Sequence, residues 1–513
     1  VVLSGATGLG ASASRFAIPS LSAAPASGGA PISPSPLQQE VARRWERQYQ
    51  SEARLRAIEA PLLRRLQAQR RPSSNTIPGI SAVPVAPDSG AHVTYRVPQG
   101  PTDLCAQYAQ IGGVVKYVGQ SGIWVSDTAN PKTADSLTDA EIKGYSDTLD
   151  AKIFAVDTSY FGAPSDIDNN GRIVIILTVQ VNKLQGGGVA GFVFSGDLFP
   201  RAACASSDTG EIFYGQVPDP DNASGTGARS KAAVMFQMPS LIAHEFTHDI
   251  QFSRRFIVSP TAGTNVTMNS WEAEGQAMFA QNAVGDAVLG YSSGNNNGWT
   301  VAHTGQGDRW YGQGFDLLAS YFGFAYTSLG KNANAPEQCT LFGGAASACY
   351  GGAFYGAAFS FEKYVTDRYA ATYPGGEKGL QHDIIDRNPG LAGATNWATT
   401  VGFDSDSVFA QWAAMLYVDD RVPGLAEDLQ LPSWNLANIF SASGYNNSIA
   451  YLTPYQENWA DFALTKSLRD GSTLYTVLSA AGPHGPLAVK VRNQLGAALS
   501  SGDHPLIWVV RIR

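Results

Sequence analysis

The order of hydrophobic patterns along the chain predicts an α+β protein. Strand-like segments come first, one of them the apolar run RIVIILTVQV, and a long stretch of helical patterns follows. Short β-type runs return after Pro432 and predict a small β-sandwich-like domain. The strand-like segments are 92–97, 114–125 and 172–181, and the helix-like ones are 137–160 and 232–416.

The N-terminal part of the chain changes composition twice. Residues 1–36 are rich in Ala, Ser, Pro and Gly with almost no charge, which predicts a tail. Residues 37–71 have apolar residues at helical spacings and predict an amphipathic helix with a kink at Pro61, whereas the Pro-rich segment 72–91 predicts a linker. The predicted divisions are therefore 1–36 (low-complexity tail), 37–71 (Arg-rich helical segment), 72–91 (linker), 92–430 (main domain) and 431–513 (C-terminal β domain).

Charge is divided unevenly between the helical segment and the rest. Of a net charge of -8, the nine Arg and four Glu of 37–71 contribute +5, which leaves -13 elsewhere. We expect the two parts to attract, so the segment is either a prosegment or brace held on an acidic body, or a solvated helix or coiled-coil arm. The acidic balance argues against nucleic acid as a partner.

Cysteine content and hydropathy favour a protein exported to an oxidising compartment. The four cysteines form no CxxC motif, and their even number is typical of disulfides, although four buried free thiols are the alternative. If they pair, Cys339 joins Cys349 and Cys105 joins Cys204. No stretch of about 18 apolar residues predicts a membrane span. Since the sequence starts at Val1, a targeting segment could already be absent, and we expect a secreted, periplasmic or cell-surface location.

The segment MPSLIAHEFTHDIQF, residues 238–252, contains the motif HExxH. Its apolar residues recur at helical spacing, with Pro239 and Ser240 expected to begin the helix. His244 and His248 then share one helical face and can bind one cation, while Glu245 can act on a water molecule rather than on the metal. Two ordinary surface histidines are the alternative, and a zinc site is the sharper hypothesis.

A catalytic zinc needs a third protein ligand, which the downstream segment SWEAEGQAMFAQ can supply. Glu274 falls on the apolar face of this predicted helix, whereas Glu272 points elsewhere. A carboxylate on an apolar face requires a cation. Gln251 and Arg254 exclude the metzincin extension of the motif, and Asp308 in GQGDRWYG is a competing third ligand.

The combination of HExxH with W-x-x-E-G-x-A resembles the gluzincin metallopeptidases, and most closely the hyicolysin family of secreted bacterial zinc peptidases. The segments YFGAPSDIDNNGRIVIIL and YGAAFSFEKYVTDRY add to this resemblance, which covers about residues 92–420. It implies a zincin-type catalytic domain in 92–430, with zinc held by His244, His248 and Glu274. It also implies Tyr355 as a donor to the oxyanion, for which Tyr311, Tyr350 and His303 stay alternatives.

These roles predict a zinc metalloendopeptidase that hydrolyses protein or peptide substrates. Zinc would activate a water molecule, Glu245 would accept its proton as general base, and zinc would polarise the carbonyl. A non-catalytic metal-containing protein that attaches to cell wall or glycan through its β domain is the alternative, and zinc-dependent hydrolysis of another bond is a third possibility.

Two further acidic features bear on metal binding. Asp166, Asp168 and Asn170, followed by Gly171, resemble the first half of a calcium loop, and an Asx-type turn is the alternative. Position 12 of such a loop would be a leucine, so an EF-hand is excluded. Asp249 is either a partner of a metal ligand or a solvated acid.

Overall fold

A computed structural model describes residues 2–6, 12–13, 36–69, 86–258, 265–325, 330–331, 336–337, 339–341, 352–441, 452, 454–458, 471–479, 492–493 and 504–508. The chain divides into two compact units. We call residues 35–291 with 373–396 the HExxH unit, and residues 1–34, 292–372 and 397–513 the companion unit.

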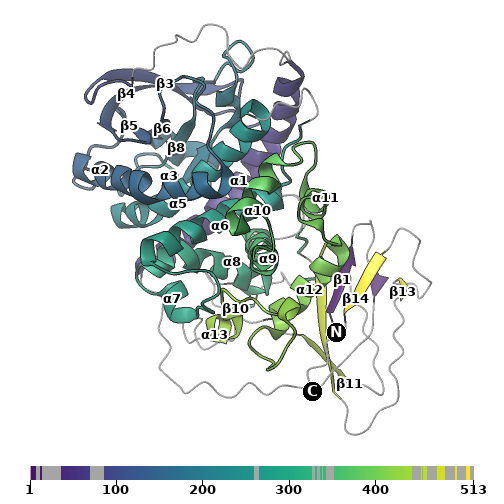
Figure 1. Cartoon of the computed structure of the whole chain (residues 1–513). Helices are drawn as coiled ribbons and strands as arrows, with labels where there is room; N and C mark the ends of the chain where they lie inside the picture. Colours follow the sequence, from purple (N-terminus) through teal and green to yellow (C-terminus); the bar gives the residue numbers. More distant parts are fainter. Residues whose placement is uncertain are drawn as a thin grey trace. The chain divides into compact units, whose positions relative to one another are not determined.

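A six-stranded mixed sheet is the framework of the HExxH unit (Figure 1). Its strand order is β3-β4-β5-β6-β8-β7, in which β5, β6 and β8 run parallel and the other neighbours pair antiparallel. Five consecutive apolar residues make β6 buried throughout, as expected for a strand covered on both faces. The strands are β3 (His92–Pro98), β4 (Tyr108–Val118), β5 (Gly122–Asp127), β6 (Ile173–Leu177), β7 (Gly191–Val193) and β8 (Ile212–Gly215).

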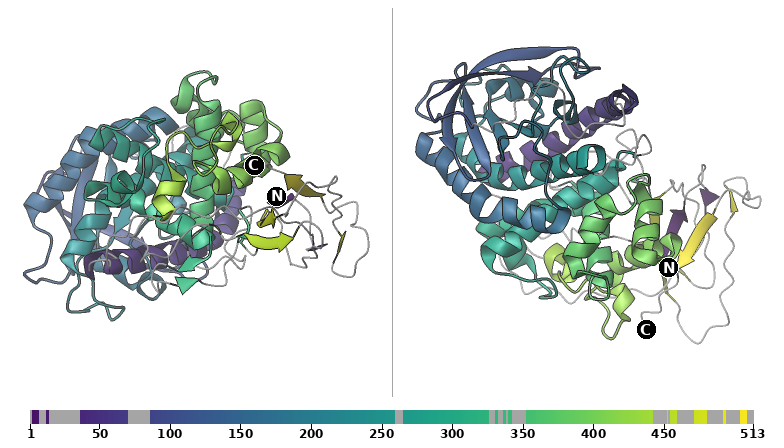
Figure 2. Two further views of the ribbon diagram at one scale, coloured as in Figure 1. Left: turned by 90° about the horizontal axis from the view of Figure 1, so that it is seen from below. Right: turned by 45° about the horizontal axis from the view of Figure 1, so that its top comes forward.

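Helices cover this sheet, and two of them, α5 and α6, pack against each other. The 34-residue helix α1 lies against α5, and Figure 2 shows it as the long purple helix. The helices are α1 (Pro36–Gln69), α2 (Asp139–Thr148), α3 (Phe154–Phe161), α4 (Val179–Lys183), α5 (Lys231–Ser253), α6 (Ser270–Leu289), α10 (Gly376–Asp386) and α11 (Gly393–Trp397, which ends at the unit boundary). Short π or 3-10 turns are η1 (Leu149–Ile153), η2 (Leu184–Gly187), η3 (Ser195–Leu198) and η4 (Arg254–Val258).

The companion unit combines helices with a four-stranded sheet of order β11-β12-β1-β14. Helices α8 and α9 pack together, and α12 contacts β1 and β14. Its helices are α7 (Trp299–His303), α8 (Gln313–Tyr321), α9 (Ala353–Tyr369), α12 (Ser405–Val418) and α13 (Leu436–Ser441), with turns η5 (Asp308–Gly312), η6 (Ala398–Gly402) and η7 (Glu427–Leu429). Its strands are β1 (Val2–Ala6), β2 (Ser12–Ala13), β9 (Phe324–Ala325), β10 (Gly330–Lys331), β11 (Tyr455–Asn458), β12 (Thr473–Ser479), β13 (Arg492–Asn493) and β14 (His504–Trp508).

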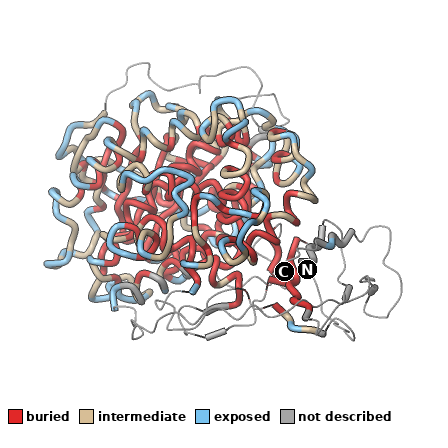
Figure 3. The backbone as a smooth tube through the Cα atoms, turned by 60° about the horizontal axis from the view of Figure 1, so that its bottom comes forward, coloured by how far each residue is buried: buried red, intermediate tan, exposed pale blue. Residues whose placement is uncertain are grey.

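The α+β class is confirmed, and Figure 3 shows the buried segments inside and the exposed ones along the outer turns. The predicted start of the HExxH helix is wrong. Helix α5 begins at Lys231, capped by the Ser230 side chain, and continues through Pro239. A proline inside a helix costs one hydrogen bond, and here the burial of α5 on many sides outweighs that cost.

The structure also bears on the predicted disulfides, the predicted tail and linker, and membrane spans. The disulfide between Cys105 and Cys204 is present, whereas Cys349 lies outside the described residues. Within the predicted tail, Val2–Ala6 forms β1, and most of the predicted linker lies outside the described residues. None of the helices in the described part of the chain is long and apolar enough to cross a membrane.

Candidate functional site

The adjacent helices α5 and α6 bring three of the predicted ligands together. The two histidines on α5 face Glu274 on α6, and all three side chains are buried. One oxygen of Glu274 lies 3.2 Å from Nε2 of His244 and 3.2 Å from Nε2 of His248. The two Nε2 atoms are 3.3 Å apart. Glu272 points the other way, because it accepts hydrogen bonds from the Gly393 backbone N–H at 2.8 Å and from Asn396.

Glutamine side chains hold the outer nitrogens of both imidazoles. Nδ1 of His248 lies 2.9 Å from Oε1 of Gln251, and Nε2 of the same glutamine donates to the Ala273 carbonyl of α6 at 3.1 Å. Nδ1 of His244 lies 3.4 Å from Oε1 of Gln281. Such contacts orient the rings of metal-binding histidines and leave Nε2 of each ring free for the metal.

A fourth group, Glu52 of α1, completes the cluster, and the sequence analysis did not select it. Its carboxylate oxygens lie 3.6 Å from Nε2 of His244 and 3.4 Å from Nε2 of His248. The side chain is 1% exposed, and its Oε2 has no hydrogen-bond donor among the described residues. Glu52 follows Trp45 and Tyr49 on the apolar face of a helix, which is the pattern that selected Glu274.

These four side chains lie close enough together to share one metal ion. With metal–ligand bonds of about 2.0–2.1 Å, a tetrahedral site separates its ligand atoms by about 3.3–3.4 Å. The Glu274 oxygen and the two imidazole nitrogens are separated by 3.2–3.3 Å, while the two oxygens of Glu52 lie 3.4 and 3.6 Å from one imidazole nitrogen each. A buried carboxylate oxygen without a donor and two imidazole nitrogens that face each other are also atoms that a cation would bind. Glu52, His244, His248 and Glu274 could therefore hold a metal.

Electrostatics within the cluster are strong because every group is buried. Against the effect of burial, Glu274 raises the pKa of His248 to about 9, and Glu52 raises the pKa of His244 well above its usual range. The same histidines hold the pKa of Glu52 well below its usual range despite its burial. A metal requires neutral imidazoles, so metal binding would release these protons.

Glu245 is buried beside the cluster but is not one of the four candidate ligands. Its Oε2 accepts the backbone N–H of Val193 in β7 at 3.2 Å and contacts the guanidinium of Arg56 at 3.4 Å. Burial, followed by the neighbouring Glu52 carboxylate, raises the pKa of Glu245 to about 8. A carboxylate with a raised pKa next to a metal site can accept and return a proton near neutral pH.

The structure places the other predicted residues in the companion unit or outside the described part. Tyr355 lies on α9 and Tyr311 in η5, and both are fully buried. Asp308 lies 3.6 Å from Nδ1 of His303, so it contacts a different histidine from the HExxH pair. Tyr350 lies outside the described residues.

The calcium-like segment forms a turn closed by its own side chains. Asp166 accepts the backbone N–H of Gly171 at 3.1 Å, and Asp168 accepts that of Asn170 at 3.1 Å. The buried carboxylate of Glu211 joins these two aspartates in a group that could hold a cation. The Asx-type turn is therefore present, and a cation remains a prediction.

Asp249 is not a solvated acid, because it is 2% exposed. Burial raises its pKa well above the usual range, and its Oδ2 has no hydrogen-bond partner among the described residues. The imidazole of His248 is held by Gln251 instead.

Comparison with known proteins finds similarity to a metalloprotease. The chain is 23% identical over 212 residues to a protein of Staphylococcus hyicus named "Neutral metalloprotease ShpI". The matched stretch is 40% of this chain and 44% of that relative, so it spans less than half the length of the curated protein. No family model matches the chain. The similarity supports metalloprotease function in general.

Proposed function

We propose that the protein is a secreted zinc-dependent endopeptidase of the gluzincin kind, similar to the hyicolysin family, with a zincin-type catalytic domain. The observation that carries this proposal is the near-tetrahedral arrangement of two imidazoles and the Glu274 carboxylate beside a carboxylate, Glu245, that is outside the ligand set. Imidazole nitrogens and a carboxylate oxygen are ligands that zinc prefers. A buried disulfide supports an oxidising compartment.

Three side chains would hold the ion: His244, His248 and Glu274. When bound, zinc would polarise the scissile carbonyl and lower the pKa of water. Glu245 would accept the proton of the attacking water and deliver it to the leaving amine, because it is buried beside the three ligands without being one of them. The Val193 N–H, at 3.2 Å, keeps one oxygen of Glu245 fixed during these transfers. Tyr355 stays our candidate for the donor that stabilises the developing oxyanion.

A second candidate function is supported by Glu52. Four protein ligands make a closed site, which is typical of structural zinc rather than catalytic zinc. A purely structural ion would belong to a non-catalytic protein that attaches to cell wall or glycan through the predicted β domain. It would, however, give no role to the buried carboxylate of Glu245 beside the ion.

Metal analysis and hydrolysis of a denatured protein mixture test the proposal together. We expect one zinc per chain in the wild type and in Glu245→Gln, and loss of peptide hydrolysis in Glu245→Gln alone. Glu272→Gln is the control, because that residue accepts hydrogen bonds from the Gly393 N–H and Asn396 and does not contact the imidazoles. Hydrolysis that persists at the wild-type rate in Glu245→Gln would refute the assignment of the base.

A further inference from the structure

One face of α1 is directed at the candidate active site. Four of its buried or nearly buried side chains recur at spacings of four, four and three residues and so lie along one face: Gln48, Glu52, Arg56 and Glu59. Each of them contacts a group that the proposed peptidase would need, either the metal ligands, the general base or the backbone of the edge strand β7.

Glu52 occupies the position that a catalytic ion leaves open. A catalytic zinc has three protein ligands and keeps its fourth place for water and substrate. One oxygen of Glu52 lies 3.4 Å from Nε2 of His248 and the other lies 3.6 Å from Nε2 of His244, so the carboxylate is close enough to the imidazoles to supply a fourth ligand. With Glu52 in this place, an ion held by His244, His248 and Glu274 has no open position.

Arg56 contacts the proposed general base and further acids. Its guanidinium contacts Glu245 at 3.4 Å, Glu274 at 3.8 Å and Glu59, its partner on α1, at 2.8 Å. The same contacts hold the guanidinium in the space beside the base, where an attacking water and a scissile peptide would have to lie.

Side chains of α1 also occupy the backbone groups of β7, the edge strand of the described sheet. Gln48 donates to the Gly191 carbonyl at 2.8 Å and accepts the Ala190 N–H. Arg56 donates to the Val193 carbonyl at 3.0 Å, and beyond the strand Glu59 accepts the Ser195 N–H at 2.7 Å. Free edge groups of this kind bind an extended peptide as an added strand, so α1 covers them as a substrate would.

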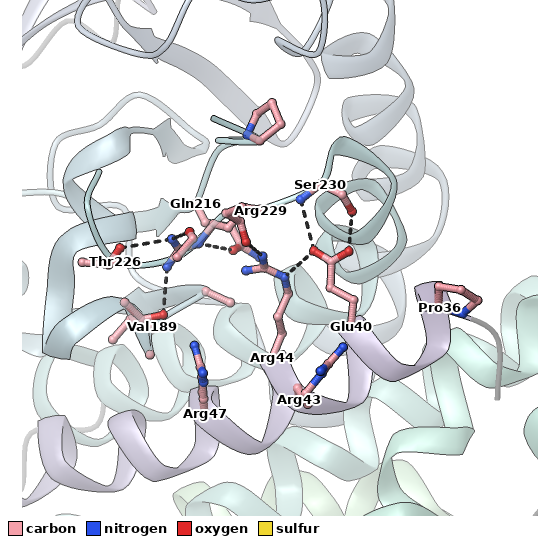
Figure 4. Close-up of a pocket in the computed structure, with 16 residues that line it drawn as sticks. Pro36, Glu40, Arg43, Arg44, Arg47, Val189, Gln216, Thr226, Arg229 and Ser230 are labelled. Atoms are coloured by element: carbon pink, nitrogen blue, oxygen red, sulfur yellow. Dashed lines mark hydrogen bonds and ion pairs between the residues drawn. The ribbon is translucent and has the colours of Figure 1, made fainter. Parts of the chain in front are cut away.

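The N-terminal half of α1 is attached through polar contacts around a cavity of about 440 Å³ (Figure 4). Glu40 accepts the Ser230 N–H at 3.1 Å and its hydroxyl at 2.7 Å, at the N-terminus of α5. Arg43, Arg44 and Arg47 of α1 line this cavity together with Arg229. The cavity is thus lined by charged groups, while Val41, Trp45 and Tyr49 of the same half of α1 are buried.

Close packing in the middle of α1 fixes its position on the body. A Cβ atom added to Gly188 would lie 1.9 Å from the Ser51 hydroxyl oxygen and 3.2 Å from the Arg47 carbonyl oxygen. The backbone of Gly188 has φ -79°, which alanine also adopts, so only the approach of α1 requires glycine there.

We propose that α1 is an intramolecular inhibitor of the peptidase, in which Glu52 closes the metal site, Arg56 blocks Glu245, and Gln48 with Glu59 covers the substrate edge. The inference rests on the proposed function, because it describes how that same site is regulated. Displacement of α1 opens the fourth metal position, frees the base and exposes β7 in a single step.

A glycine substitution outside both α1 and the catalytic set tests this device. Gly188→Ala should loosen α1 and raise peptidase activity of the full chain by roughly tenfold, the effect of one overpacked contact. Gly144→Ala is the matched control, because its added Cβ meets no atom within 4 Å. Adding Ser51→Gly to Gly188→Ala removes the principal clash and should restore the low activity. An increase that Ser51→Gly does not reverse would count against displacement of α1.

A metal-centred measurement is independent of peptide hydrolysis. The Co²⁺-substituted full chain should bind acetohydroxamate at least about tenfold more tightly in Glu52→Ala than in the wild type, because the open position admits the probe. Arg54→Gln, on the exposed side of α1, should behave as the wild type. Cleavage at a specific protease site placed in the predicted linker should raise both hydroxamate binding and peptide hydrolysis.

The outcomes separate the inference from the function on which it rests. Equal hydroxamate binding in Glu52→Ala and wild type, together with full activity of the intact chain, would overturn the inhibitor and leave the peptidase. Tighter hydroxamate binding without hydrolysis in any variant, including the cleaved chain, would overturn the peptidase and support α1 as the cover of the metal site.

Discussion

Replacement of Glu274 by glutamine tests the ligand set directly. The substitution keeps the shape of the side chain but removes the charge whose oxygen lies 3.2 Å from both imidazole nitrogens. Loss of one partner from a buried charge cluster costs about 3–5 kcal/mol. Since 1.4 kcal/mol is a tenfold change, zinc affinity should fall by roughly 100- to 4,000-fold.

Glu52 should reduce the loss of zinc affinity that Glu274→Gln causes. While α1 is docked, Glu52 would still provide a carboxylate, so the loss in Glu274→Gln should lie at the lower end of that range. The double variant Glu52→Gln with Glu274→Gln should lose more affinity than the two single losses combined, because neighbouring ligands of one ion are coupled.

Zinc affinity is measured by competition with a chromophoric chelator at fixed pH. Glu272→Gln is the matched control on the same helix, because its partners are the Gly393 N–H and Asn396, not the imidazoles. It should lower thermal stability and leave zinc affinity unchanged. If Asp308→Asn weakened zinc binding more than Glu274→Gln did, Asp308 would be the third ligand and the reasoning from helix faces would be refuted.

Three further predictions concern orientation and stability. Gln251→Ala should weaken zinc binding by about 10- to 100-fold, because it releases Nδ1 of His248, and an unchanged affinity in the same competition would show that the glutamine does not orient the ring. Asp157→Leu should stabilise the fold by about 1–3 kcal/mol at pH 8, because both carboxylate oxygens are buried without a hydrogen-bond donor among the described residues. Burial raises the pKa of Asp157 well above its usual range. The free-energy cost of keeping this carboxyl group buried is therefore absent below about pH 3.9 and increases as the pH rises through the folded-state pKa. Thermal unfolding at pH 4 and pH 8 should therefore show the larger gain at pH 8, and an equal gain would contradict the titration. Removal of the disulfide in Cys105→Ser with Cys204→Ser should cost about 4–5 kcal/mol in urea unfolding, since the bridge closes a loop across a sequence separation of 99, and a loss below 1 kcal/mol would argue against a loop-entropy origin.

The positions of the two histidines and Glu274 could be predicted because helix geometry alone determines which residues share a face. Residues four apart on α5 must lie on the same side, and an acid among the apolar residues of α6 must face a cation or an equivalent partner. Neither inference needs the tertiary structure. The convergence of α5 and α6 is the only step for which the sequence offered a resemblance instead of a physical reason.

Glu52 was missed although the same reasoning applied to it. The net charge of +5 in segment 37–71 predicts attraction to an acidic body, but it does not identify the residues of the two parts that contact each other. The acids on its apolar face, Glu52 and Glu59, were available as a signal. The N-terminus of α5 was misplaced for a related reason, because a local proline signal was preferred over the burial that only the tertiary structure provides.

The charge balance of the cluster distinguishes a removable inhibitor from a permanent ligand. Within α1, the acids Glu52 and Glu59 are opposed by Arg56, and these three side chains leave together when the helix leaves. What remains around the site is Glu245 and Glu274, whose two negative charges a divalent cation balances. The site with a divalent cation is thus balanced without α1, whereas these three side chains of α1 carry one net negative charge among themselves. A permanent structural ligand would be needed for balance in the folded unit, and Glu52 is not.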